Sequence, residues 1–130
     1  GDNAILISQN PNNLNEILLP DVTLQEINSA NKIYFAFNPE DNIQSNLYYF
    51  DANIRPRLKN FILSCTVDVE SCANLPLKAC KDADSSSRII QVSLANESSV
   101  TYNNNCLLIQ GQKQELPSLI DAVILKLLLQ

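Results

Sequence analysis

Four cysteines and no histidine set the first limit on the fold of this chain of 130 residues. The cysteines stand at positions 65, 72, 80 and 106, with six, seven and twenty-five residues between them. Structural zinc sites usually bring their ligands in close CxxC-type pairs, so this spacing does not favour zinc. An even number of cysteines in a small domain is typical of disulfides. The alternative is four buried reduced thiols in a cytosolic protein.

The four cysteines allow three disulfide pairings. We expect Cys65 to pair with Cys72 and Cys80 with Cys106, because the first loop is local and the second ties an irregular segment to a core strand. Chain-entropy arithmetic gives about 2.5 kcal/mol for the first loop and about 3.5 kcal/mol for the second. A Cys72–Cys80 bond is the main alternative. Disulfides predict an exported protein, extracellular or at the cell surface.

The missing residue types exclude several kinds of chemistry. Without histidine there is no imidazole base and no Ser-His or Cys-His nucleophile pair. The two glycines, Gly1 and Gly111, cannot supply a glycine-rich loop for phosphates or dinucleotides. The serines lack a GxSxG motif, and the cysteines lack a CxxC redox spacing. We therefore expect no enzymatic activity, no metal and no cofactor.

The chain is acidic, with a net charge of −5 and a pI near 4.5. A nucleic acid would be repelled on average, so we do not expect one as a partner. The densest basic stretch is Arg55, Arg57 and Lys59, which we interpret as a solvated helix face.

Hydrophobic patterning predicts one α/β (or α+β) domain over residues 1–130. We expect a small mixed sheet with helices packed on it and a disulfide-bearing irregular middle over residues 66–87. Residues 46–50 are β-prone and would form a hairpin with the strand at 32–37, whereas Leu58, Phe61, Ile62 and Cys65 recur at helical spacing after Pro56. The other expected strands are 4–8, 88–94, 100–102 and 106–110, with helices after Asn10-Pro11 and over 116–128.

The closing helix carries apolar residues beyond one face, including Leu125 and Leu129. It is therefore deeply buried, or it is a contact for a protein partner or a second copy. Gly111 stands at the turn before this helix, where we expect a positive φ. The longest apolar run, 123–129, is too short for a membrane helix. The chain begins Gly1-Asp2-Asn3, so a signal or membrane anchor would have preceded Gly1.

Three groups of residues are candidates for binding or catalysis. Tyr34, Tyr48 and Tyr49 belong to a stretch rich in aromatic residues that could bind a small ligand or a glycan, although alternating aromatic residues more often build a core. A carboxylate-dependent hydrolase would need two acids facing each other across a cleft. The acidic residues of this chain occur in close groups. The residues from Asp82 to Ser86 also place oxygen donors at alternate positions, but they lack the full pattern of a calcium-binding loop. These groups are Glu40 with Asp41, Asp68 with Glu70, and Asp82 with Asp84.

The two ends of the chain are similar to each other. Residues 3–10 precede a predicted helix, and residues 106–111 precede the helix at 116–128. These strand-loop-helix units resemble modules of exported archaeal surface-layer proteins, over about forty residues. The resemblance implies an exported, surface-attached domain without known catalytic activity.

Together these observations predict a non-catalytic exported domain with a structural or interaction role at a cell surface. A small-ligand or glycan-binding module is the alternative, and a carboxylate-dependent hydrolase is a third reading. A single glycosylation sequon, Asn96-Glu97-Ser98, falls in an expected turn.

Overall fold

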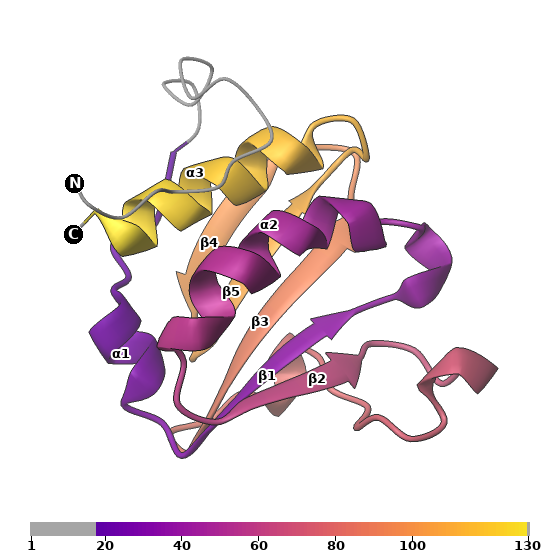
Figure 1. The fold of residues 1–130 in the computed structure, drawn as a ribbon, viewed down its shortest axis with the longest axis horizontal. Coiled ribbons are helices and arrows are strands. Elements are labelled where there is room, and N and C mark those ends of the chain that lie inside the picture. Colours follow the sequence, from indigo (N-terminus) through magenta and orange to yellow (C-terminus); the bar gives the residue numbers. More distant parts are fainter. Residues whose placement is uncertain (1–17, 130) are drawn as a thin grey trace.

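The computed structural model describes residues 18–129, whose chain forms a five-stranded sheet and three α-helices (Figure 1). The strand predicted at residues 4–8 and the helix predicted after Asn10-Pro11 lie outside the described residues. The predicted α/β class, with a mixed sheet and an irregular disulfide-bearing middle, is confirmed. The elements are α1 (Leu24–Asn28), β1 (Lys32–Phe37), α2 (Gln44–Ile54), β2 (Phe61–Cys65), β3 (Ser87–Leu94), β4 (Ser99–Asn103), β5 (Cys106–Gly111) and α3 (Leu116–Leu128).

The sheet has the strand order β2-β1-β3-β5-β4. β1 pairs in parallel with both β2 and β3, and β3 pairs in parallel with β5. β4 is antiparallel to β5 and forms one edge, so β2 forms the other. Parallel strands are usually covered on both faces, so their side chains are apolar on both sides. This explains why β1, β3 and β5 are continuous apolar runs in the sequence.

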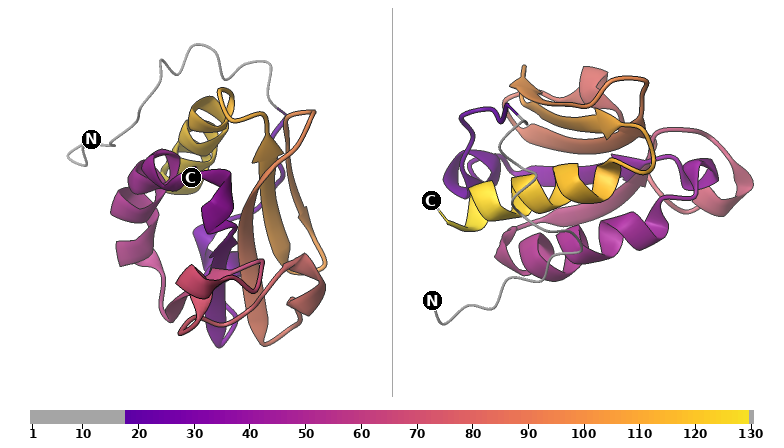
Figure 2. Two further views of the ribbon diagram at one scale, coloured as in Figure 1. Left: turned by 90° about the vertical axis from the view of Figure 1, so that its right-hand side faces the viewer. Right: turned by 90° about the horizontal axis from the view of Figure 1, so that it is seen from above.

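The main core lies between the sheet and a layer formed by α2 and α3, which lie side by side on one face (Figure 2). Phe35 and Ile90 point from the sheet into this core, and Phe50 and Ile120 meet them from the helices. A smaller cluster covers the opposite face, where the segment around Cys80 packs on Tyr34 and Ile89. The irregular segment between β2 and β3 therefore serves as a partial second layer.

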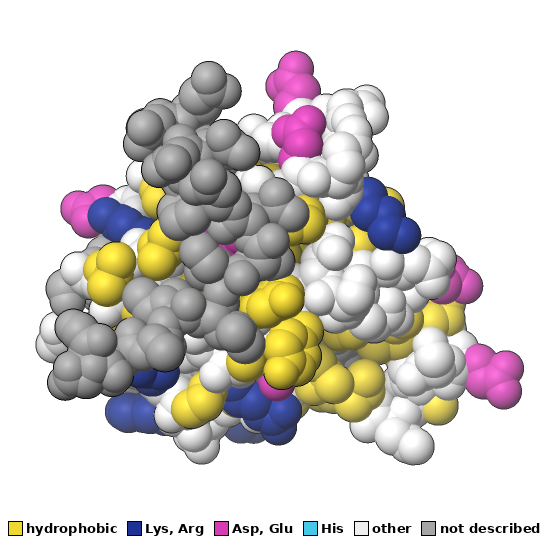
Figure 3. Space-filling view, turned by 45° about the horizontal axis from the view of Figure 1, so that its top comes forward, with side chains coloured by type: hydrophobic (Ala, Val, Ile, Leu, Met, Phe, Trp, Pro, Cys, Tyr) yellow, Lys and Arg dark blue, Asp and Glu magenta, His cyan; other side chains and the backbone are white. Residues whose placement is uncertain are grey.

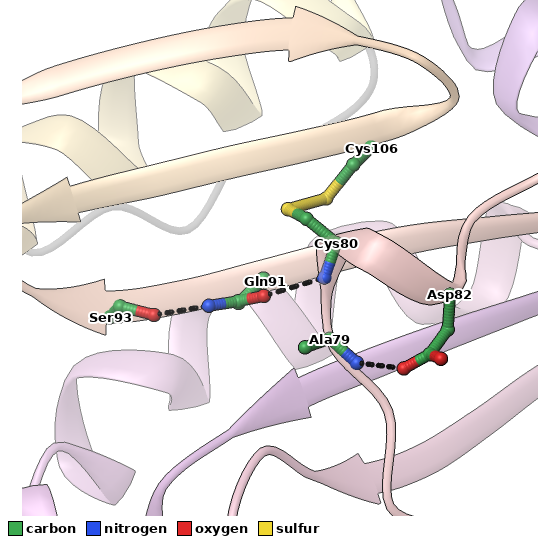
Figure 4. Close-up of a disulfide and its surroundings, with 6 residues drawn as sticks. All are labelled: Ala79, Cys80, Asp82, Gln91, Ser93 and Cys106. Carbon is green, nitrogen blue, oxygen red and sulfur yellow. Dashed lines mark hydrogen bonds between the residues drawn. A yellow bond between two sulfur atoms is a disulfide. The ribbon is translucent and has the colours of Figure 1, made fainter.

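Both disulfides have the pairing favoured by the sequence, Cys65–Cys72 and Cys80–Cys106. The segment carrying Cys80 is also held by a hydrogen bond, since the Cys80 N–H donates to Oε1 of Gln91 at 2.9 Å (Figure 4). The other end of that amide donates to the Ser93 hydroxyl at 2.8 Å. A covalent bond and a side-chain amide thus fasten this segment to two neighbouring parallel strands.

Two predictions of secondary structure are wrong, and they concern adjacent elements. Residues 46–50 are helical and belong to α2, because Leu47, Phe50 and Ile54 form one buried stripe against the sheet. The predicted helix after Pro56 is instead a short 3₁₀ turn followed by β2, so the spacing that ends at Cys65 was a coincidence within an apolar strand. Short apolar runs fit either structure until their neighbours are known.

Gly111 does not need a positive φ, which corrects the expected reason for glycine at this position. The requirement is space: a Cβ here would lie 2.8 Å from Leu119 Cδ1 and 2.9 Å from Ser98 Oγ. Among residues 18–129, positive φ values occur instead at Asn42, Asn104 and Asn105, and the last two make the tight turn between β4 and β5. Asparagine tolerates this conformation better than most residues do.

The apolar residues of α3 are mostly used inside the protein, because the helix contacts both the sheet and α2. Leu125 and Leu128 are partly buried, and only Leu129, 69% exposed, is open to solvent at its end. Within residues 18–129, none of the helices combines the length and apolar character needed to span a bilayer.

Candidate functional site

The candidate site is an open, mostly apolar groove of about 250 Å³ where α2 lies over the β2 edge of the sheet. We call it the edge groove. β1 contributes two aromatic rings, β2 contributes one leucine, and α2 contributes the remaining wall. The lining residues are Phe35, Phe37, Gln44, Leu47, Tyr48, Asp51 and Leu63.

Two large apolar side chains beside the groove are exposed to solvent. Tyr48 is 61% exposed on α2, and Leu63 is 41% exposed on β2. Below them Phe35 is fixed by ring contacts, with its centroid 5.2 Å from that of Phe50 and 5.7 Å from that of Phe61. The groove therefore has an aromatic floor, held by ring contacts, and an exposed apolar rim.

The groove borders backbone groups that no strand within residues 18–129 covers. Asn60 accepts a hydrogen bond from Ile33 in β1, and Cys65 is bonded on its other side to Pro76 and Lys78. Because residues along a parallel strand alternate in the side to which their N–H and C=O point, Phe61 and Leu63 share the outward direction of Cys65. The open part of the edge is thus the short stretch from Phe61 to Leu63.

Opposite charges lie at the two ends of β2. Lys32 and Lys59 line a hollow at its amino end, and Glu40 and Glu70 line another at its carboxyl end. All four side chains belong to exposed residues. In the face shown in Figure 3, dark-blue side chains lie at the lower left and at the upper right, magenta ones lie at the right, the top and the left, and yellow ones lie between. The hollow at the amino end of β2 is therefore lined by basic residues and the hollow at its carboxyl end by acidic ones, while Lys78, whose N–H donates to the Cys65 carbonyl, also lies beside the carboxyl end.

The basic stretch seen in the sequence lies at the end of α2, close to the groove. Arg55 lies 4.8 Å above the Phe61 ring and forms an exposed ion pair with Asp51 at 3.5 Å. Arg57 donates from Nη1 to the carbonyl of Asn53 at 3.0 Å, ending the helix. Arg55 and Arg57 are exposed as expected, but they belong to a 3₁₀ turn and not to a helix face.

The structure does not bring the three tyrosines together as a ligand platform. Tyr34 is buried on the face of the sheet opposite α2, where Lys78 Nζ lies 4.7 Å from its ring centroid. Tyr48 and Tyr49 are neighbours on α2 with an edge-to-face contact at 5.2 Å, but Tyr49 packs against the main core. Only Tyr48 remains available to a ligand, as part of the edge groove.

The carboxylates have different surroundings. Glu40 and Glu70 share the hollow at the carboxyl end of β1 and β2. Asp82 Oδ2 accepts from the Ala79 N–H, and Asp84 Oδ1 accepts from the Ser86 N–H, so these two acids fix local turns. Among residues 18–129, no group of three or more His, Cys, Asp or Glu side chains is placed to hold a metal ion.

Sequence reasoning missed a polar cluster at the amino end of β3. The buried Arg88 donates to Glu26 Oε2 at 2.9 Å and to the Ser29 hydroxyl at 2.9 Å, and Tyr102 donates to the same Glu26 oxygen at 2.6 Å. The three hydrogen-bonded pairs are 59 to 76 positions apart in sequence, so no local motif could identify them. The cluster fixes α1 to β3 and β4.

The cluster shifts the pKa values of Glu26 and Tyr102. The hydrogen bond from Tyr102 holds the pKa of Glu26 below its ordinary value, with the Arg88 charge acting in the same direction. Burial, together with the bond to Glu26, raises the pKa of Tyr102 to about 12. Because the Arg88 guanidinium also donates to the carbonyls of Asp84 and Ser85, we interpret this cluster as a structural anchor.

Comparison with protein-family models, curated proteins and solved structures finds no match for this chain. The edge groove and the two disulfides are therefore the features from which function can be inferred.

Proposed function

We propose that this protein is a non-catalytic exported domain that acts at a cell surface by binding another polypeptide through the edge groove. The observation that carries the proposal is the pair of exposed apolar side chains, Tyr48 and Leu63, over a rigid aromatic floor and beside an open strand edge. Adjacent exposed apolar side chains beside a groove are typical of interaction sites. An added strand could use the free backbone groups while its side chains enter the groove.

The two disulfides support the placement outside the cytoplasm, because such bonds persist where thiols are not continually reduced. Surface attachment is also what the resemblance to exported archaeal surface-layer modules implies. The sequence predicts that the closing helix contacts a protein partner or a second copy, whereas we assign the contact to the β2 edge. α3 is the less suitable element, because most of its apolar residues lie in the core.

Compartment is tested in the source cells. A membrane-impermeant amine reagent applied to intact cells should label exposed lysines such as Lys59 and Lys113. Alkylation under denaturing conditions should modify no cysteine before reduction and four after it, as read by mass spectrometry. Four free thiols, or lysine labelling only after lysis, would contradict export.

Binding is tested with a photoreactive phenylalanine derivative in place of Tyr48. The matched control carries the same residue at Glu97, which is exposed in the distant loop between β3 and β4. We expect irradiation of intact cells to give a discrete crosslinked species from position 48 and none from position 97. Absence of any crosslink at position 48 would refute the assignment of the groove.

A further inference from the structure

The charged residues at the two ends of the β2 edge differ in sign. An edge of this kind can complement a second copy of itself. Lys32 and Lys59 mark the amino end of the strand, and Glu40 and Glu70 mark the carboxyl end. When two identical strands pair antiparallel, the amino end of each lies beside the carboxyl end of the other. Lys59 of each copy would then lie near the end that carries Glu40 and Glu70 in the other copy, where the half-buried Lys78 is the basic residue joined to Cys65.

We propose that the occupant of this edge is a second copy of the chain, paired β2 to β2 about a two-fold axis. This inference rests on the proposed function, of which it names the partner. A two-fold interface uses the same patch on both subunits, so the patch must complement itself. Here the self-complementary elements are the open backbone from Phe61 to Leu63, the groove beside it and the two charged ends.

The backbone directions fix the register of the pair. Phe61 and Leu63 point their N–H and C=O groups outward, whereas Ile62 points its own toward β1. The hydrogen-bonded partners are therefore Phe61 of one copy and Leu63 of the second copy, in both directions. This places Ile62 on the two-fold axis and gives four hydrogen bonds between the copies.

The length of the open edge limits the strength of the dimer. Leu77 already bridges Cys65, so pairing stops after Leu63. The edge grooves lie on the helix-covered side of both strands and would join across the axis, which brings the exposed Tyr48 and Leu63 of each copy toward the interface. A short ladder with a small apolar contact predicts a reversible dimer that weakens as salt rises.

The test is sedimentation equilibrium of the whole chain over a concentration series at low salt. Wild type should dimerise reversibly. Lys59→Glu and Glu70→Lys should each weaken dimerisation about tenfold or more, because each change creates two like-charge contacts in a homodimer. A one-to-one mixture of these two variants should associate again, since both contacts in the heterodimer join opposite charges.

Two controls have the same changes of net charge at exposed sites away from the edge. Lys113→Glu matches Lys59→Glu, and Glu97→Lys matches Glu70→Lys. Both should dimerise as wild type does, and circular dichroism checks that every variant is folded. Control variants that lose dimerisation equally, or a mixture that stays monomeric, would overturn antiparallel pairing through β2.

The photocrosslink at position 48 separates the two proposals. A species of twice the chain mass supports the dimer. A monomeric wild type that crosslinks to a different protein overturns self-pairing and leaves the groove as an interaction site. A monomeric wild type without any crosslink overturns both.

Discussion

Removing the Cys80–Cys106 disulfide should destabilise the protein more than removing Cys65–Cys72. The perturbation is the replacement of both cysteines of a pair by alanine, so that no free thiol remains. Sequence separations of 26 and 7 correspond to closed-loop entropies worth about 3.5 and about 2.5 kcal/mol. The Cys80 segment also covers the smaller core cluster, so its release exposes Tyr34 and Ile89 and adds to the larger loss.

The assay is urea unfolding followed by circular dichroism. With a denaturant slope of roughly 1.5 kcal/mol/M, the midpoint should fall by about 2.3 M without Cys80–Cys106 and by about 1.7 M without Cys65–Cys72. The second double variant is the control, because it also removes one bond and two sulfur atoms. Equal midpoints, or a reversed order, would refute the reasoning from loop length and from the cover of the second face.

Three further predictions concern single residues. Gly111→Ala should lower the free energy of unfolding by about 1 to 3 kcal/mol, since its Cβ would crowd Leu119 and Ser98; an unchanged urea midpoint would show that the neighbours can move away. Tyr102→Phe should cost about 1 kcal/mol at neutral pH, as measured by urea unfolding. The folded pKa of Tyr102 is raised from 10.0 to about 12, so its contribution is complete below pH 10 and is lost as the pH rises through 12; the variant should lack this alkaline loss, and identical pH profiles would contradict the bond to Glu26. Asn105→Gly should leave thermal stability nearly unchanged whereas Asn105→Val should lower it, because the φ of 68° suits glycine and strains a β-branched residue.

The parts of the fold that could be predicted from the sequence are those with an unambiguous local pattern. β1, β3 and β5 are continuous apolar runs, and α3 has a long apolar face. The errors at α2 and β2 arose where short apolar runs fitted both the spacing of a helix and the alternation of a strand. Phe61 fitted the expected helix, yet its side chain packs against the main core from a strand. Which structure such a run adopts is decided by the sheet that it joins.

The site was less predictable than the fold, because it combines elements that are distant in sequence. Tyr48 was singled out as an aromatic residue, but its partner in the edge groove, Leu63, had no local feature that marked it. The charged ends of β2 likewise come from separate loops, with Glu40 following β1 and Glu70 following β2. The pairing of the cysteines was predictable because Cys65 and Cys72 are close in sequence and Cys106 lies on a strand that the apolar pattern marked.

The Cys80–Cys106 bond also acts as a covalent check on strand alignment during folding. Cys106 stands opposite Ile89 in the parallel pair of β5 and β3, on the face away from the helices. A slip of β5 by one residue would turn Cys106 toward the helices, out of reach of Cys80. Formation of the bond therefore excludes a one-residue slip of β5, and the bond then keeps that misaligned state from returning.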